Sequence, residues 1–138
     1  MEKPIIAMTM GDPAGIGPEL VVKVLSHPSS LEGCRPLVIG DLQIMQRAVR
    51  LVESPINFRK ITSPEMAAFS WPQIDLLSPD DLSIVSVAEG KVDPEMGKAV
   101  ASCLKMAAEL ATGGIVQGLV SAPLNKESFH LAGFHYRD

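Results

Sequence analysis

The chain has 138 residues, a formal net charge of −4 at pH 7, and apolar and charged fractions of 46% and 20%, which are ordinary for one globular domain. The acidic balance, without any cluster of Lys or Arg, argues against nucleic-acid binding. No run approaches the roughly 18 apolar residues of a membrane span, and the N-terminus lacks the basic leader of a secretory signal. We therefore expect a cytoplasmic protein without a membrane partner.

The first predicted unit is a strand, a glycine-rich turn and a helix. Residues 5–10 form a continuous apolar run, which is typical of a strand buried on both faces of a parallel sheet. The turn GDPAGIG follows at residues 11–17. Pro18 suits the first position of a helix, which we expect to continue over residues 20–26 before His27-Pro28 ends it.

A second unit repeats this pattern. Residues 36–40 predict a strand, Asp41 suits an N-cap, and apolar residues at helical spacing predict a helix up to Val52. The next segment is punctuated by prolines, and we interpret it as strands and loops. Its three short apolar runs lie at residues 56–61, 74–77 and 82–87.

The longest predicted helix covers residues 94–112, with Asp93 as its N-cap and a Gly-Gly pair as its stop. Its apolar stripe consists of Met96, Val100, Cys103, Leu104, Ala107 and Ala111. Residues 115–120 then predict another buried strand, and Asn125 is placed to cap a last short helix. The alternation of strands and helices indicates a layered α/β fold with a largely parallel sheet.

The turn at residues 11–17 is the first candidate for ligand binding, because ligands of open α/β sheets lie beyond the carboxyl ends of strands. Gly11, Gly15 and Gly17 match neither GxGxxG nor the phosphate-binding loop. Their bare backbone would let a ligand approach closely, but glycines also serve tight turns without any ligand. Asp12 is similarly either a ligand acceptor or a cap of its own turn.

The second candidate is SAPLNKE, residues 121–127. Lys126 could neutralise a carboxylate or phosphate that Ser121 and Asn125 hydrogen-bond, although a capping Asn125 and a surface Lys126 are the commoner explanation. His130 and His135 do not have the spacing of a paired metal site such as HExxH, and no GxSxG is present. The two cysteines have no CxxC partner, and we expect reduced thiols in the core.

Two long motifs carry a resemblance to a known family. AMTMGDPAGIGPE at residues 7–19 and SAPLNKESFHLAGFHY at residues 121–136 resemble the PdxA-type family of 4-hydroxythreonine-4-phosphate dehydrogenases. The resemblance implies a three-layer α/β/α fold like that of isocitrate and isopropylmalate dehydrogenases, present here incompletely. Because no finishing element follows Gly133, we expect residues 1–138 to be the N-terminal part of a two-domain dehydrogenase whose second domain is absent.

The resemblance also implies a reaction. It is the oxidation, with decarboxylation, of a 4-phosphorylated C4 hydroxy acid such as 4-hydroxythreonine 4-phosphate or 4-phosphothreonate, in a homodimer that uses NAD (or NADP) and a divalent metal such as Zn, Mg or Co. The substrate-binding His-Thr pair and the metal ligands of the family fall after Asp138. The sequences SAPLNKE and LAGFHY are closer to those of the branch that acts on phosphorylated threonate or erythronate. The candidates for cleft contacts in this chain are Gly11, Asp12, Gly15, Gly17, Ser121, Asn125 and Lys126.

Two other interpretations stay open at this point. The chain could be a truncated, catalytically inactive piece, or a non-catalytic α/β module for dimerisation or ligand binding. An unrelated phosphate-binding α/β module would require both long motifs to match by chance.

Overall fold

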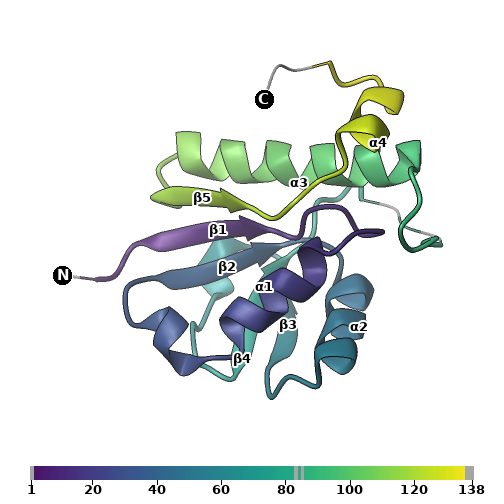
Figure 1. Ribbon diagram of the computed structural model, residues 1–138. Coiled ribbons are helices and arrows are strands. Elements are labelled where there is room, and N and C mark those ends of the chain that lie inside the picture. Colours follow the sequence, from purple (N-terminus) through teal and green to yellow (C-terminus); the bar gives the residue numbers. More distant parts are fainter. Residues whose placement is uncertain (1, 83, 85, 136–138) are drawn as a thin grey trace.

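A computed structural model describes residues 2–82, 84 and 86–135 of the chain. Their strands form one parallel sheet in the order β3-β4-β2-β1-β5 (Figure 1). The strands are β1 (Ile5–Thr9), β2 (Arg35–Ile39), β3 (Asn57–Ile61), β4 (Gln73–Leu77) and β5 (Gly118–Ser121). The prediction of a largely parallel α/β sheet is confirmed.

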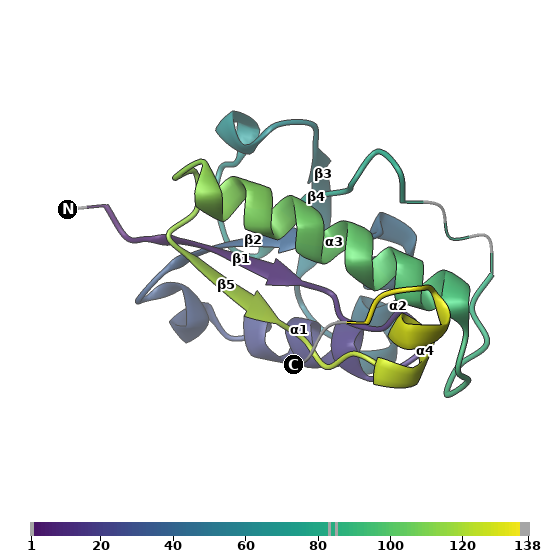
Figure 2. The ribbon, with the colours of Figure 1, turned by 90° about the horizontal axis from the view of Figure 1, so that it is seen from above.

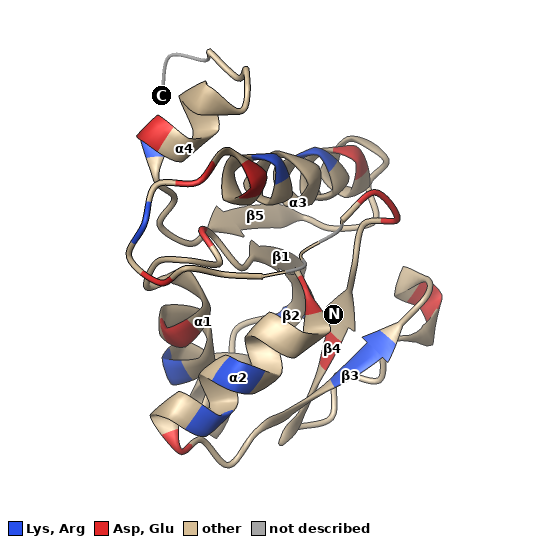
Figure 3. Cartoon of the chain, turned by 90° about the vertical axis from the view of Figure 1, so that its right-hand side faces the viewer, with Lys and Arg blue, Asp and Glu red and all other residues tan. Residues whose placement is uncertain are grey.

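Helices cover both faces of this sheet. The α-helices are α1 (Gly17–Leu25), α2 (Leu42–Val52), α3 (Pro94–Thr112) and α4 (Lys126–Leu131), and two short 3-10 turns are η1 (Pro28–Leu31) and η2 (Pro64–Met66). The crossovers through α1 and α3 run in opposite directions across the sheet, so the right-handed rule puts these helices on opposite faces. Figures 2 and 3 show α3 on one face and α1 with α2 on the other, which is the three-layer arrangement.

Capping residues determine where two of the helices begin. The side chain of Asp41 accepts a hydrogen bond from the Ile44 N–H at 2.9 Å, and that of Asp93 accepts one from the Glu95 N–H at 2.9 Å. Each bond satisfies an N–H group that has no partner within the first turn of its helix. The predicted starts of α2 and α3 are therefore confirmed.

The prediction of a buried strand over residues 115–120 is wrong in its bounds and in its burial. β5 occupies only Gly118–Ser121, and its side chains are largely exposed, with Leu119 at 40% and Val120 at 50%. β5 pairs with β1 alone among the described residues, so it is an edge strand rather than a central one. An apolar run predicts a strand but does not show how many neighbours the strand has.

The three apolar runs of the middle segment have different outcomes. The first run contains β3, and the second lies within β4, which begins one residue earlier. In the third, Leu82, Ile84 and Val87 belong to no strand but pack, half-buried, against the core. Ser83 and Val85 of this run lie outside the described residues.

The core is aliphatic, and one thiol belongs to it. Burial, with smaller contributions from Asp41 and Asp81, raises the pKa of the Cys103 thiol to about 12, so this thiol stays protonated and unreactive. Both cysteines are free, as predicted, but Cys34 is only half-buried, so the prediction of a core thiol is confirmed for Cys103 and wrong for Cys34. Among the described residues no helix combines the length and apolar character needed to cross a membrane.

Candidate functional site

The two candidate turns meet where the strands β1 and β5 end, on the carboxyl side of the sheet. β1 and β5 are parallel neighbours in which Thr9 is paired with Ser121, so the chain leaves both strands at the same edge. The Asp12 N–H donates a hydrogen bond to the Pro123 carbonyl at 3.0 Å and joins the turns directly. The structure thus confirms that both turns lie at the carboxyl ends of strands, and it brings them into contact.

The three glycines of the first turn differ in whether the structure requires glycine at their positions. Gly11 has φ +73°, and a Cβ there would lie 2.4 Å from the Pro123 carbonyl oxygen. Gly17 has no such φ, but its Cβ would lie 2.4 Å from the carbonyl oxygen of Met10. At Gly15 the nearest atom to a Cβ would be 3.5 Å away, an ordinary contact. The protein's own backbone therefore excludes side chains at Gly11 and Gly17, whereas Gly15 has room for one.

Asp12 is a buried carboxylate at the junction of the turns. It is 4% exposed, and its Oδ1 accepts a hydrogen bond from the Ala14 N–H at 2.8 Å, so it does cap its own turn. Burial raises the pKa of Asp12, the Ala14 hydrogen bond opposes this rise, and the charge of Asp93 adds to it. Acids whose environment disfavours their charged form are typical of functional sites. The capping role of Asp12 is therefore compatible with a second role in ligand binding.

The second turn presents polar groups beside Asp12. The Asn125 side chain accepts a hydrogen bond from the Ser128 N–H at 3.0 Å and caps α4, as expected of a structural Asn at this position. The Ser121 hydroxyl donates to the Ala122 carbonyl at 3.1 Å. Lys126 is exposed at the first position of α4. All seven candidate residues therefore belong to two touching turns.

A groove of about 920 Å³ borders the second turn and extends between α3 and α4. Apolar side chains dominate its walls, and the charged or polar groups are Lys126, Lys105, Asp81, His130 and Ser102. Its apolar lining residues are Ala101, Leu104, Ala108, Ala122, Pro123, Leu124, Phe129 and Phe134. Of the six residues in the predicted apolar stripe of α3, only Leu104 lines this groove. The repeat at residues 101, 104, 105 and 108 is the helical spacing that marks the wall of the groove.

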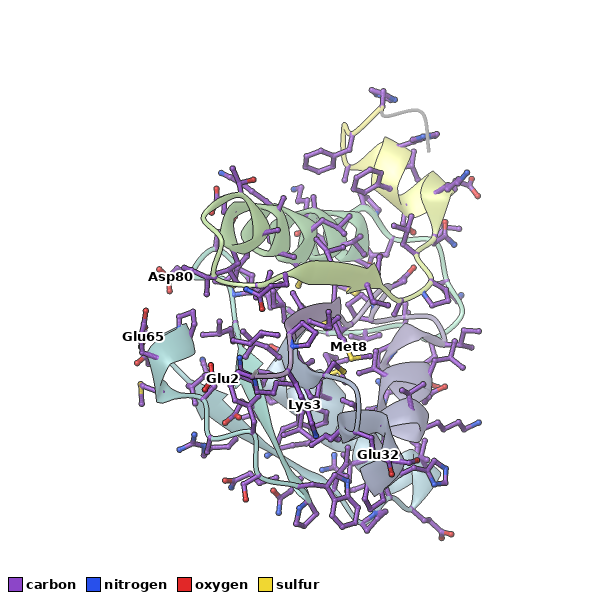
Figure 4. All side chains as sticks on the ribbon, turned by 90° about the vertical axis from the view of Figure 1, so that its left-hand side faces the viewer. Glu2, Lys3, Met8, Glu32, Glu65 and Asp80 are labelled. Atoms are coloured by element: carbon purple, nitrogen blue, oxygen red, sulfur yellow. The ribbon has the colours of Figure 1, made fainter. Side chains whose placement is uncertain are left out.

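The opposite end of the sheet offers contacts of a structural kind. Glu2 and Lys3 precede β1 (Figure 4). Lys3 donates to the Leu31 carbonyl at 2.8 Å, and Glu2 lies 3.5 Å from Arg35. These charges tie the N-terminal segment to its neighbours, so the candidate site stays at the carboxyl edge.

The described residues do not provide a metal centre. No three His, Cys, Asp or Glu side chains among residues 2–82, 84 and 86–135 form a group that could hold a metal ion. The His130 and His135 rings are neighbours, with centroids 5.6 Å apart, but no third ligand from this part of the chain joins them. We assign no metal ligand to the described residues.

The chain is similar to known proteins. The profile described as PdxA, pyridoxal phosphate biosynthetic protein PdxA, matches residues 32–138. A 4-hydroxythreonine-4-phosphate dehydrogenase from Trichlorobacter lovleyi is 42% identical over 135 residues, which are 97% of this chain and 40% of the relative. A D-threonate 4-phosphate dehydrogenase from Cupriavidus necator is 40% identical over 135 residues, 96% of this chain and 40% of that relative.

A solved structure agrees with the sequence comparisons. The crystal structure of a 4-hydroxythreonine-4-phosphate dehydrogenase from Burkholderia phymatum superposes with a TM-score of 0.94 and 37% identity, and covers all of this chain and 42% of that one. The chain therefore spans about two-fifths of the length of these relatives. The profile match over most of the chain leads to one conclusion: the chain belongs to the PdxA family.

Proposed function

We propose that the complete protein to which this chain belongs oxidises the secondary alcohol of a 4-phosphorylated C4 hydroxy acid and decarboxylates the product. Relatives named as dehydrogenases of 4-hydroxythreonine 4-phosphate and of D-threonate 4-phosphate support this activity. As the resemblance implies, we propose NAD (or NADP) as the hydride acceptor and a cytoplasmic homodimer as the active form. Residues 1–138 would be the N-terminal part of a two-domain enzyme.

The observation that carries the proposal is the contact between the two turns at the carboxyl edge of β1 and β5. Lys126 would supply positive charge to the phosphate or carboxylate of the substrate, because a charge-assisted hydrogen bond is the strongest kind that such a group can receive. Ser121 and Asn125 would contribute hydrogen bonds, and Asp12 would be the acidic group of the cleft. Gly11 and Gly17 would keep the turns in contact.

A divalent ion is implied by the family, but the described residues contain no group of three ligands that fits one. We therefore place the metal ligands outside the described residues and assign no step of the reaction to a metal at this site.

The substrate branch is open to a direct comparison. Relatives named for the two substrates are 42% and 40% identical to this chain, so overall similarity does not separate the branches. From the amino-acid sequence of the second motif we propose 4-phosphothreonate as the preferred substrate. A higher kcat/KM for 4-phosphothreonate than for 4-hydroxythreonine 4-phosphate would support this choice, and the reverse order would contradict it.

The complete enzyme tests both the activity and the site. NADH formation would be followed with each substrate and with Mg²⁺, Zn²⁺ or Co²⁺, for the wild type and for the variant Lys126→Ala. We expect turnover by the wild type and a KM raised roughly tenfold or more by the variant, the effect of losing a charged hydrogen bond. Lys23→Ala, which removes an exposed lysine from the last turn of α1, is the matched control.

Two outcomes would contradict different parts of the proposal. No turnover of either substrate by the complete wild-type enzyme would reject the activity. Normal turnover with an unchanged KM in Lys126→Ala would keep the activity and reject the assigned role of Lys126.

A further inference from the structure

Helix α4 is attached to the start of α3 by a buried hydroxyl. Ser128 is 1% exposed, and its Oγ accepts a hydrogen bond from the Asp93 N–H at 2.9 Å. Asp93 is also the N-cap of α3, and the Ser128 N–H donates to the side chain of Asn125. The caps of both helices are therefore connected through one serine.

A glycine of α3 allows the two helices to come this close. A Cβ on Gly97 would lie 2.2 Å from the Ser128 carbonyl oxygen and 3.0 Å from the Phe129 Cα. Both are backbone atoms, so a side chain at this position could not be accommodated by a change of rotamer. Gly97 has no positive φ, and the requirement for glycine here is therefore one of space.

The same segment is held at its other end by the first turn. The Pro123 carbonyl accepts the Asp12 N–H at 3.0 Å, and its oxygen lies 2.4 Å from the position that a Cβ on Gly11 would occupy. Residues 123–128 are thus fixed at Pro123 by the turn after β1 and at Ser128 by α3. Lys126 and Asn125 lie between these two attachments.

We propose that Asp93, Gly97 and Ser128 form a clamp of positioning residues, which holds the second turn against Asp12 and so fixes where Lys126 stands in the site. A six-residue helix has little stability of its own, so the orientation of α4 depends on such contacts. The clamp gives α3 a role at a site to which it contributes no candidate residue. The functional meaning of this inference rests on the proposed function, whereas its geometry does not.

Nuclear magnetic resonance of the 138-residue chain tests the clamp without any assay of turnover. The variants are Ser128→Ala, which removes the acceptor of the Asp93 N–H, and Gly97→Ala, which forces the backbones apart. In both we expect the Asp12 amide to exchange with solvent at least roughly fivefold faster relative to amides of β2, the factor expected for one weakened hydrogen bond. We also expect the pKa of the Asp12 carboxyl to lie closer to its ordinary value of 3.8, because its burial and the repulsion from the Asp93 charge, which both raise the pKa, would decrease.

The matched control is Ser102→Ala in the same helix. The Ser102 hydroxyl donates to the exposed Asp81 carboxylate at 3.1 Å and does not join α3 to α4, so the exchange and titration of Asp12 should not change. If Ser128→Ala weakens the protection of all amides equally and leaves the titration of Asp12 unchanged, the serine only stabilises the fold and the clamp is wrong. If Gly97→Ala does not fold, amide exchange and titration of Asp12 in the milder variant Ser128→Ala still test the clamp. Loss of the proposed activity would affect none of these measurements.

Discussion

The two edges of the sheet are built in opposite ways. β3, at one edge, carries Arg59 and Lys60, whereas β5, at the other, carries no charged residue and exposes Leu119 and Val120 (Figure 3). Charged side chains protect an edge strand from pairing with another chain. The edge at β3 is therefore protected by charged side chains, whereas the edge at β5 is apolar and exposed in this chain.

A buried carboxylate completes the edge at β3. Asp75 of β4 is 2% exposed, and its Oδ1 accepts two hydrogen bonds from Arg59, at 2.9 and 3.2 Å. Its Oδ2 accepts the N–H groups of Ala68 and Phe69 at 3.0 and 2.9 Å, which fixes the segment between β3 and β4. Phe69 in turn lies under the guanidinium of Arg35, 5.2 Å from the ring centroid. All these polar groups serve the fold.

The edge at β5 is instead continuous with the candidate site. Val120, Leu20 and Val24 line a groove of about 190 Å³ between β5 and α1. Met8 of β1 lines it as well (Figure 4). This groove shares Ala122 and Pro123 with the larger groove under α4. The candidate site residues therefore lie beside the edge formed by β5, whereas the polar groups at the edge formed by β3 hydrogen-bond within the fold.

The largest expected effect on the free energy of unfolding is at the edge formed by β3. Asp75→Ala leaves Arg59 and two N–H groups without their acceptor. Arg59 is 36% exposed and can turn to water, so most of the cost comes from the two N–H groups, at about 1–3 kcal/mol for each. We expect chemical denaturation to show a loss of this size. Glu2→Ala, which removes an exposed partner of Arg35, should leave the free energy of unfolding unchanged. Equal effects of the two variants would contradict the buried role of Asp75.

The next effect is at the junction beside β5. Gly11→Ala combines a positive φ with a Cβ 2.4 Å from the Pro123 carbonyl oxygen, and we expect a loss of about 2–4 kcal/mol in the free energy of unfolding. A Cβ on Gly33 meets nothing within 4 Å, so Gly33→Ala is the control and should change stability little. Thermal melts of the two variants would check this. A tolerated Gly11→Ala would show that the two turns need not touch.

Asp12→Asn tests whether the open edge keeps a carboxylate at a cost to stability. Burial raises the pKa of Asp12 above 3.8, so folding disfavours the charged form, and the wild type should gain stability as the pH falls through the raised pKa towards 3.8. Asn keeps an acceptor for the Ala14 N–H but has no charge, so the variant should be the more stable protein at neutral pH, with the difference shrinking in acid. Denaturation curves between pH 7 and pH 4 would measure this. A variant that is less stable at neutral pH would contradict the burial argument.

The smallest effect is expected on β5 itself. Val120→Thr should change the free energy of unfolding of this chain by no more than about 0.5 kcal/mol, because Val120 is 50% exposed. The same change at Val38 of β2, which is 0% exposed, buries a hydroxyl and should cost about 1–3 kcal/mol. Urea denaturation of both variants gives the comparison. A cost at Val120 as large as at Val38 would show that the edge at β5 is already covered in solution.

The sequence by itself determined the elements whose signals are local. Asp93, Pro94 and the Gly-Gly pair predicted the bounds of α3, and Asn125 predicted the start of α4, because caps and breakers act through the nearest backbone groups. The two long motifs indicated the family without any structure. The seven candidate site residues came from the same motifs, and the structure places them in two touching turns.

Only the tertiary structure decided what depends on neighbours distant in the sequence. The apolar run at residues 115–120 could not show that β5 is an edge strand, since strand order is a property of the whole sheet. The requirement for glycine at Gly97 comes from a helix some 30 residues further on, and the room at Gly15 from the absence of any such neighbour. Local sequence determines the conformation of a segment, whereas packing determines which of its atoms meet another segment and which stay available to a ligand.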